Sequence, residues 1–173
     1  SKADQKSELQ LSSTGELRHY SWAELSPGKA EATVDPDNQF LIEHMIPAPN
    51  DKPIDQPFIL PPSTAILDDY FFSQRELLAW RYLGSNCSPD ASGNTECKLG
   101  KVDFGALIPR QRASVLVSMQ YMGKERVMIH GKPMELDRFN LLGDGIDWAL
   151  WLDNSHLLQR VVITSDGTEV VRD

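Results

Sequence analysis

The stretch GDGIDWALWLDNSHLLQRVVI, residues 143–163, decides the fold class of this chain. A Gly-Asp-Gly turn leads into the alternating segment 146–152, polar residues 153–156 form a second turn, and residues 157–163 return as an apolar segment. Alternation with a period of two is the pattern of a β-strand, because successive side chains of a strand point to opposite faces. Short polar or glycine-rich turns join antiparallel neighbours. The stretch therefore predicts two antiparallel strands that follow each other along the chain.

Antiparallel strands are predicted on both sides of that stretch, over the whole segment 103–172. Residues 114–121 alternate, and Gly123 is expected to turn the chain into a further strand. Apolar positions change phase near Arg138, which predicts a β-bulge there. Because consecutive strands with short loops form a meander, we expect a meander over residues 103–172.

Strands are also predicted at the beginning of the chain. Residues 7–46 contain alternating segments separated by turn residues, which predict two successive hairpins. Residues 47–62 are rich in proline, and proline fits neither a helix interior nor a central strand. Since apolar side chains are scattered through this segment, we expect a crossing that lies against the domain.

One helix is predicted over residues 64–83. Ser63 or Thr64 supplies an N-cap, and a glycine follows the expected end. Asp68 and Asp69 place negative charge near the positive end of the helix dipole. The apolar stripe of this helix, which is expected to pack on a sheet, consists of Leu67, Tyr70, Phe71, Leu77, Leu78, Trp80 and Tyr82. Its polar side carries Gln74, Arg75 and Arg81.

These elements predict a mainly β fold in a single domain over residues 1–173. A sheet of about ten or eleven strands must curl or close. We therefore expect one strongly curved antiparallel sheet, a half-barrel, with the α-helix packed on its concave face. The expected order is strands over 7–46, the crossing over 47–62, the helix over 64–83, a cysteine loop over 84–100 and the meander over 103–172.

Cys87 and Cys97 lie together in a polar loop. Free thiols normally prefer burial, and structural zinc needs four ligands, whereas no histidine lies near these cysteines in the sequence. A disulfide is therefore favoured over two inert thiols or a metal site, and it predicts a periplasmic or extracellular protein. A membrane anchor in the full-length protein is compatible with that expectation. The triplet Asn86-Cys87-Ser88 also fits the N-glycosylation pattern.

The charge balance argues against nucleic acid as a partner. The chain has 17 Lys+Arg against 25 Asp+Glu, a formal net charge of -8, whereas phosphate recognition depends on clustered cations. Apolar runs such as Phe40-Leu41-Ile42 have the length of a strand and not of a bilayer span. We therefore expect neither a nucleic-acid partner nor a transmembrane segment.

The sequence carries no familiar catalytic motif: it has no phosphate-binding loop, dinucleotide fingerprint, nucleophile elbow or His-Glu-x-x-His zinc motif. The histidines stand on different predicted strands or turns, and each is more typical of a structural histidine than of a metal ligand or general base. They are His19, His44, His130 and His156. We therefore expect no catalytic residue, no metal site and no cofactor, and hence a protein that is not an enzyme.

Large apolar side chains are expected on the concave face of the sheet. A half-closed sheet with a helix as its lid leaves an apolar cavity in its mouth, and lipid-type ligands occupy such cavities. The candidate lining residues are Trp22, Phe40, Phe71, Trp80, Tyr121, Trp148 and Trp151.

The end of the chain resembles a group of exported bacterial proteins. Residues 147–153, residues 157–163 after the turn, and residues 166–172 resemble their terminal pattern LWxD, turn, LxR, dG and evvR. Residues 66–71 resemble their central segment. The folds of that group are similar to the half-barrel of the periplasmic lipoprotein carriers, in which a curved antiparallel sheet closed by helices holds acyl chains. The resemblance implies the same curved sheet and a lipid ligand, and it implies no catalytic residues.

The sequence thus predicts a non-enzymatic exported domain that binds a lipid or another hydrophobic molecule on the concave face of its sheet. Two alternatives stay open. One is a protein-interaction module of a cell-envelope assembly, which docks a protein on an edge strand or on residues 47–62. The other is a hydrolase, which needs a nucleophile within hydrogen-bond reach of His44 or His130.

Overall fold

The chain forms two compact units in the computed structural model, which describes residues 4–68 and 71–173. We call them the N-terminal unit and the C-terminal unit. The N-terminal unit runs up to Phe71 and includes Gly105–Ser114, and the C-terminal unit consists of Phe72–Phe104 and Val115–Asp173. This division does not test the expectation of a single domain over residues 1–173, which stays a prediction.

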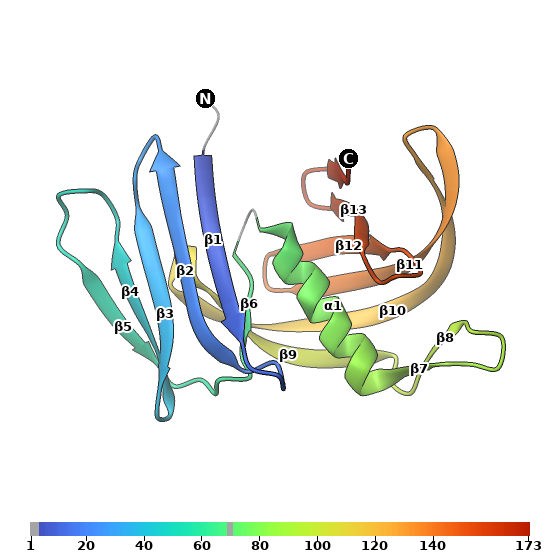
Figure 1. Cartoon of the computed structure of the whole chain (residues 1–173), viewed down its shortest axis with the longest axis horizontal. Coiled ribbons are helices and arrows are strands. Elements are labelled where there is room, and N and C mark those ends of the chain that lie inside the picture. The colour runs from blue at the N-terminus through green and yellow to red at the C-terminus, as the bar shows by residue number, and fades with distance from the viewer. Residues whose placement is uncertain (1–3, 69–70) are drawn as a thin grey trace. The chain divides into compact units, whose positions relative to one another are not determined.

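The N-terminal unit is built on a five-stranded antiparallel sheet in which each strand pairs with the next one along the chain (Figure 1). Its strands are β1 (Asp4–Leu11), β2 (Leu17–Ser26), β3 (Glu31–Asp37), β4 (Phe40–Ile46) and β5 (Ile54–Phe58). The strands predicted over residues 7–46 are confirmed. β5 lies inside the proline-rich crossing, and its position at the edge of the sheet tolerates Pro57.

One face of this sheet forms the core of the N-terminal unit. Tyr20, Val34 and Glu43 lie in one row across β2, β3 and β4, because Tyr20 pairs with Val34 and Val34 pairs with Glu43. The buried side chains of this core are Leu17, Tyr20, Trp22, Ala32, Val34, Leu41, Ile66 and Leu107. Glu43 therefore occupies a core position on a largely apolar face.

The segment after the crossing forms a short strand and not the start of a helix. β6 (Ala65–Ile66) pairs in parallel with Ala106 and Leu107 of β9 (Lys101–Ile108). Leu67 continues this contact, since its backbone N–H donates to the carbonyl oxygen of Leu107. The side chains of β6 and of Leu67 are buried. Pairing with a distant strand thus outweighs the helical pattern of this segment.

The helix α1 (Phe72–Asn86) consequently begins later than the predicted range 64–83 and ends beyond it. The predicted cap at Ser63 or Thr64 is wrong. Asp68 does not serve as a helix N-terminal charge, because it is fully buried in the N-terminal unit. Two further residues that the sequence assigns to the helix lie outside the described residues, namely Asp69 and Tyr70.

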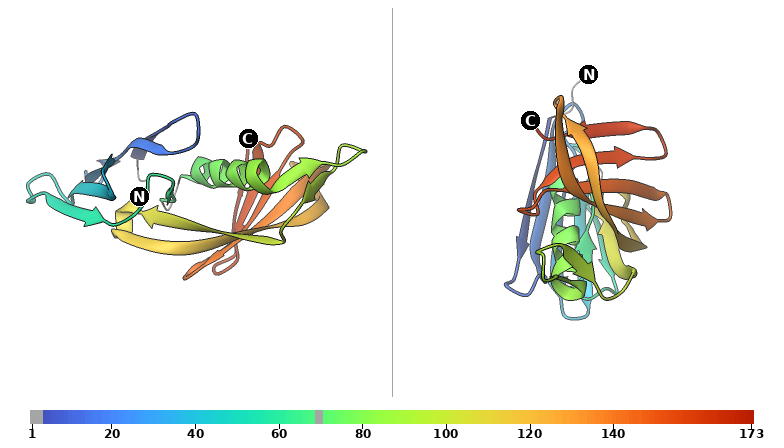
Figure 2. Two further views of the ribbon diagram at one scale, coloured as in Figure 1. Left: turned by 90° about the horizontal axis from the view of Figure 1, so that it is seen from below. Right: turned by 90° about the vertical axis from the view of Figure 1, so that its right-hand side faces the viewer.

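The second large sheet has the strand order β14-β13-β12-β11-β10-β9-β6. Its remaining strands are β10 (Ala113–Ile129), β11 (Lys132–Gly143), β12 (Ile146–Leu152), β13 (Leu158–Ile163) and β14 (Thr168–Val171). Successive strands from β10 to β14 pair antiparallel, which confirms the predicted meander. Figure 2 shows these strands, in orange and red, lying side by side. The sheet ends at β14 and β6 and does not close into a barrel.

β10 runs through the position where the sequence predicts a turn. Gly123 has a φ of 100° inside this strand, and the register to β11 shifts between Tyr121 and Gly123. Gly123 pairs with Arg138, so the predicted bulge near Arg138 is confirmed, with the extra residue on the opposite strand. The predicted turn at Gly123 is wrong, because a glycine with positive φ serves a bulge as well as a turn.

α1 packs across one face of the C-terminal part of this sheet (Figure 1). Tyr82 meets Phe139 of β11 edge to face, with ring centroids 5.9 Å apart. Phe72 meets Trp148 of β12, with ring centroids 6.0 Å apart. Leu78 and Tyr82 are fully buried, which confirms their place on the apolar stripe.

Two polar residues of α1 are also buried, contrary to the expectation that they face solvent. Gln74 and Arg75 are 4% and 5% exposed, and the Arg75 guanidinium lies 4.3 Å from the ring centroid of Trp148. This cation–π contact, together with the apolar stem of arginine, explains how Arg75 fits a buried position. Arg81 is half-buried, with its guanidinium 5.4 Å from the Phe104 ring centroid.

The predicted fold class is confirmed: the chain is mainly β, and the described residues contain one α-helix. Consecutive strands pair antiparallel from β1 to β5 and from β10 to β14, as do β7 and β8, whereas β6 pairs in parallel with β9. The strands divide into two large sheets and one two-stranded sheet, whereas the sequence predicts one curved sheet. Strand patterns do not specify how strands far apart in the sequence pair, and the first sheet ends at β5. No helix in the described part of the chain is long and apolar enough to cross a bilayer.

Candidate functional site

The cysteine loop is a hairpin closed by a disulfide. β7 (Cys87–Pro89) pairs antiparallel with β8 (Thr95–Cys97), and Cys87 lies directly opposite Cys97. These two residues form the predicted disulfide. Asp90 holds the turn between the strands, because its carboxylate accepts two backbone hydrogen bonds from within the turn. The hairpin is thus held by a covalent bond between its strands and by hydrogen bonds within its turn.

Asn86 ties the end of α1 to the chain that follows the hairpin. Its side-chain amide donates to the carbonyl oxygen of Leu99, and its side-chain oxygen accepts from the backbone N–H of Leu99, both at 2.9 Å. Asn86 is 4% exposed. Since both ends of its side chain are bonded and buried, the triplet at residues 86–88 is not accessible to glycosylation in the folded chain.

A pocket of about 330 Å³ lies between the end of α1, the hairpin and the turn that joins β12 to β13. Its volume is at the low end of the range of roughly 300–1,000 Å³ that is typical of ligand pockets. We call it the disulfide-walled pocket. Residues that line it include Trp80, Leu83, Cys87, Pro89, Thr95 and His156. The lining is largely apolar, and its polar side chains are those of Ser88, Thr95 and His156.

Trp80 presents the largest apolar side chain to this pocket. It is 39% exposed, whereas Trp22, Trp148 and Trp151 are 3%, 8% and 4% exposed. The indole N–H of Trp80 donates a hydrogen bond of 2.5 Å to the backbone oxygen of His156. Because its one donor is satisfied, the indole offers only apolar ring surface to the pocket.

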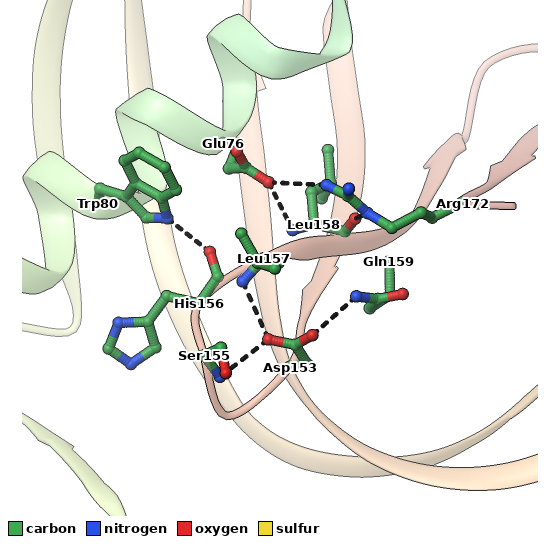
Figure 3. A network of polar contacts seen from close by, with 9 residues as sticks. All are labelled: Glu76, Trp80, Asp153, Ser155, His156, Leu157, Leu158, Gln159 and Arg172. Carbon is green, nitrogen blue, oxygen red and sulfur yellow. Dashed lines mark hydrogen bonds and ion pairs between the residues drawn. The ribbon is translucent and has the colours of Figure 1, made fainter.

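Asp153 fixes the turn that carries His156 (Figure 3). Its carboxylate accepts hydrogen bonds from the backbone N–H groups of Ser155 and Leu157, at 2.8 and 3.0 Å, and from the side-chain amide of Gln159. His156 has a φ of 62°, a conformation that such turns often contain. The carbonyl group that receives the indole N–H is thus held in place by the turn itself.

Glu76 joins the same turn to α1, one helical turn before Trp80 (Figure 3). Its carboxylate accepts a hydrogen bond from the backbone N–H of Leu158 at 2.6 Å and another from the guanidinium of Arg172 at 3.3 Å. The side chain of Glu76 is 12% exposed. Since residues four apart on a helix share one face, Glu76 and Trp80 together anchor this turn and the start of β13.

A second polar site lies in the core of the N-terminal unit. Glu43 is 0% exposed, and neither of its carboxyl oxygens has a hydrogen-bond partner in the described part of the chain. Burial and, next, the charge of Asp68 raise the pKa of Glu43 to about 8, while Arg112 opposes this shift. Asp68 itself accepts hydrogen bonds from the Tyr20 hydroxyl at 2.5 Å and from the Arg110 backbone N–H at 3.0 Å. Glu43 is therefore mostly neutral at pH 7.

Carboxylates or a backbone group contact the side chains of His19, His44 and His130. His19 lies 2.5 Å from Asp35, and His44 hydrogen-bonds Asp55, both on the sheet face opposite the core of the N-terminal unit. His130 bonds a backbone oxygen near the end of the chain. The hydrolase alternative gains no nucleophile from these contacts. No group of three or more His, Cys, Asp or Glu side chains among the described residues is placed to hold a metal ion.

The residues predicted to line a cavity are divided between the two units. Trp22, Phe40 and Phe71 belong to the N-terminal unit, and Trp80, Tyr121, Trp148 and Trp151 belong to the C-terminal unit. Trp148 faces α1, whereas Trp151 lies on the opposite face of β12, flanked by the guanidinium groups of Arg138 and Arg160. Trp148 and Trp151 therefore do not line one cavity. Of the seven residues, Trp80 lines the disulfide-walled pocket.

The other predicted lining residues take structural positions. Trp22 belongs to the core of the N-terminal unit, and it also lines a separate pocket of about 380 Å³ on the sheet of that unit. Phe71 packs against the same core. Phe40 is 38% exposed at the start of β4. The Tyr121 hydroxyl donates to Asp137 at 2.7 Å, and burial raises the pKa of Tyr121.

Sequence reasoning missed most of the pocket. The contact that joins its two walls, between Trp80 and His156, connects residues 76 positions apart. No local pattern encodes a contact over such a separation. The spacing of Cys87 and Cys97 was the one signal available, since a disulfide between them closes the hairpin that forms a third wall.

Comparisons with known proteins give no match to this chain, neither a family model, nor a curated protein, nor a solved structure. The resemblance to exported bacterial proteins and to the lipoprotein carriers therefore stays a prediction from the sequence. The function has to be inferred from the geometry of the pocket and of the buried carboxyl groups.

Proposed function

We propose that the C-terminal unit is a non-catalytic binding domain that takes a small hydrophobic ring compound in the disulfide-walled pocket. The observation that carries the proposal is that Trp80 lines the pocket while its indole N–H is already hydrogen-bonded. Its indole N–H is bonded to the backbone of His156, so the ring lies in the pocket wall in a fixed orientation and without an unsatisfied donor. A tryptophan held in a concave site is a typical anchor for a flat apolar ligand.

The size and lining of the pocket favour a compact ligand. About 330 Å³ accommodates a compound of one or two rings, whereas a long acyl chain needs a deeper channel. Leu83 and Pro89 add apolar contact, and the Thr95 hydroxyl and the His156 imidazole are polar groups that orient a ligand. The sequence-based expectation of a lipid or hydrophobic ligand is thereby narrowed to small ring compounds.

The pocket is also pre-formed, which suits reversible binding. The disulfide holds one wall, and the hydrogen bonds of Asp153 and Glu76 hold the turn that carries His156. Rigid walls reduce the entropy that binding has to remove. A ligand would therefore meet the pocket in its binding conformation.

The disulfide supports an exported protein, because thiols in the cytosol are normally kept reduced. A periplasmic or extracellular location is therefore part of this proposal. A lipid on a concave sheet face and docking to an envelope protein stay predictions from the sequence.

Tryptophan fluorescence tests the proposal, since Trp80 is the most exposed of the four tryptophans. We expect the probe 1-anilinonaphthalene-8-sulfonate to bind the full chain and to protect Trp80 from quenching by acrylamide. Trp80→Ala should weaken probe binding about five- to tenfold, given that an aromatic contact contributes roughly 0.5–1.5 kcal/mol beyond its buried area. Trp80→Phe should keep most of the affinity.

Trp151→Phe is the matched control, because Trp151 is buried on the face of β12 opposite α1 and does not line the pocket. This variant should bind the probe as the parent protein does. Equal probe affinity of Trp80→Ala and the parent would contradict the proposal. Palmitate serves as the acyl-chain comparison, and saturable palmitate binding that Trp80→Ala leaves unchanged would favour a lipid site elsewhere in the chain.

A further inference from the structure

The buried carboxyl group of Glu43 takes no part in the disulfide-walled pocket. It projects from the core face of β4, in one row with Val34 and Tyr20. Its neighbour on the other side is Gln56 of the edge strand β5, which is uncharged. Both carboxyl oxygens lack a hydrogen-bond partner among the described residues. A fully buried polar group without a partner is rare in native structures and requires a physical explanation.

Charged and titratable groups from three other elements surround Glu43. Asp68, just beyond β6, acts on it as a negative charge, and Arg112, at the end of the 3-10 helix η1 (Pro109–Gln111), acts as a positive one. Tyr20 of β2 reaches the same region, since its hydroxyl donates to Asp68. β6 and η1 therefore meet the sheet beside Glu43.

The two carboxyl groups of this region are in different situations. Asp68 accepts hydrogen bonds from the Tyr20 hydroxyl and from the Arg110 backbone N–H, and such bonds stabilise a carboxylate. The Arg110 guanidinium is directed to the Trp22 ring, 4.3 Å from its centroid. Ionisation of Glu43 would therefore place a second negative charge in the core, without donors to stabilise it.

We propose that Glu43 is a proton-binding site through which pH controls the stability of the N-terminal unit. With its proton bound, Glu43 adds no charge beside Asp68. When the proton leaves, the new charge repels Asp68 and draws water into the core. The contacts that Asp68 makes with β2 and η1 are then the first to weaken. The N-terminal unit is thus most stable at mildly acidic pH and loosens at the junction of β6 and η1 as the pH rises.

The direction of this effect follows from the titration of Glu43. Burial and Asp68 raise its pKa from 4.5 to about 8, so between these values the folded unit binds a proton that the unfolded chain has already lost. The stability that this proton contributes is complete below the lower value and is lost as the pH rises through the upper one. In the pH window from 4.5 to about 8, the folding equilibrium constant falls by up to about tenfold per pH unit, compared with a protein that carries a neutral side chain at position 43.

Hydrogen exchange of the full chain, followed by mass spectrometry on peptides from both units, tests the proposal. Glu43→Gln keeps the shape of the protonated acid but cannot ionise. Near the lower end of the window, the parent and the variant should protect the N-terminal unit equally. Near the upper end of the window, amide hydrogens of the N-terminal unit should exchange about tenfold or more slowly in the variant than in the parent. Comparison at the same pH cancels the intrinsic exchange rate.

Two controls separate this effect from a general one. Peptides of the C-terminal unit should exchange alike in the parent and in Glu43→Gln at every pH. Glu31→Gln, at an exposed position of the same sheet, should follow the parent protein in both units. An identical pH dependence of the N-terminal unit in the parent and in Glu43→Gln would overturn the proposal.

A direct measurement of the Glu43 titration by NMR keeps the proposal testable if Glu43→Gln does not fold. The parent protein, labelled with ¹³C at the glutamate carboxyl carbons, reports each titration by NMR. One glutamate that titrates above neutral pH supports the proposal, and a set that all titrate below neutral pH contradicts it. Neither experiment involves a ligand, so its outcome is independent of the pocket in the C-terminal unit.

Discussion

Two glutamates, one in each unit, show how the units use buried charge. Glu43 in the N-terminal unit is fully buried and has no hydrogen-bond partner among the described residues. Glu76 in the C-terminal unit has a side chain that is 12% exposed, and it accepts hydrogen bonds from Leu158 and Arg172. Both side chains are largely removed from solvent, and the decisive difference lies in their hydrogen-bond partners. The difference teaches that a buried carboxyl group with hydrogen-bond donors around it connects segments of the chain, whereas one without such donors binds a proton.

The same contrast separates the two sites in function. In the C-terminal unit, Glu76 and Asp153 hold the turn beside Trp80, so polar groups build the wall of an apolar pocket. In the N-terminal unit, Glu43 lies inside the core and lines none of the walls described above. Substitution of the two glutamates by glutamine should therefore act in opposite directions, and each unit should respond separately.

The largest effect is expected from removal of the disulfide. By the loop-entropy estimate, a disulfide across so short a loop contributes about 2–3 kcal/mol. Cys87→Ser combined with Cys97→Ser should lower the free energy of unfolding of the C-terminal unit by about that amount. Urea unfolding with hydrogen exchange as the readout measures each unit separately. Probe binding should weaken as well, because Cys87 lines the pocket.

Ser92→Ala, at an exposed position in the turn of the same hairpin and outside the lining of the pocket, is the control for the double serine variant. It should leave both stability and probe affinity unchanged. An equal loss of stability in the N-terminal unit of the double serine variant would break the comparison, since it would show that the units unfold together.

A smaller effect is expected from Glu76→Ala. A hydrogen bond to a charged group contributes roughly 1.5–3 kcal/mol, and the partly exposed Arg172 adds little to it. We therefore expect a loss of about 2 kcal/mol in the free energy of unfolding of the C-terminal unit, measured by urea unfolding. Glu43→Gln should instead raise the free energy of unfolding of the N-terminal unit at pH 8. A variant of Glu76 that gains stability would contradict the distinction drawn between the two glutamates.

The strand pattern, the meander and the disulfide were predictable because they depend on short stretches of sequence. Alternation between turns marks strands wherever one face is buried, and residues 143–163 show it clearly. The start of the helix was not predictable from such a stretch. Ala65 and Ile66 fit a helical pattern, and their pairing with Ala106 and Leu107 decides the outcome.

The buried position of Glu43 could be predicted from the sequence pattern, whereas the disulfide-walled pocket could hardly be predicted at all. Alternation in β4 places Glu43 on the same face as Leu41 and Met45, so a charged residue stands in an apolar phase. The sequence does not show whether a hydrogen-bond donor lies next to Glu43 in the folded chain. The pocket needs the turn at His156 to reach Trp80, and this contact depends on the complete arrangement of α1 and the meander.

The smallest effect, and the sharpest test of how the pocket wall is built, is expected from Asp153→Ala. The backbone hydrogen bonds of Asp153 are exposed to water, which can replace them, so their loss together with the bond from Gln159 should lower the free energy of unfolding of the C-terminal unit by only about 1 kcal/mol. The backbone oxygen of His156 would then no longer be held toward the Trp80 indole. Probe affinity should fall about two- to threefold, and acrylamide should quench Trp80 more strongly even without a probe.

Asp166→Ala is the matched control for this variant, because Asp166 accepts the same kind of turn bond from the backbone N–H of Thr168 but lies outside the network of Figure 3. It should leave probe affinity and Trp80 quenching unchanged. If Asp153→Ala and Asp166→Ala bind the probe alike, the turn does not position Trp80, and the wall must be held by the disulfide hairpin and by Glu76 alone. If they differ, a polar network that touches no ligand sets the affinity of an apolar pocket, as the comparison of the two units implies.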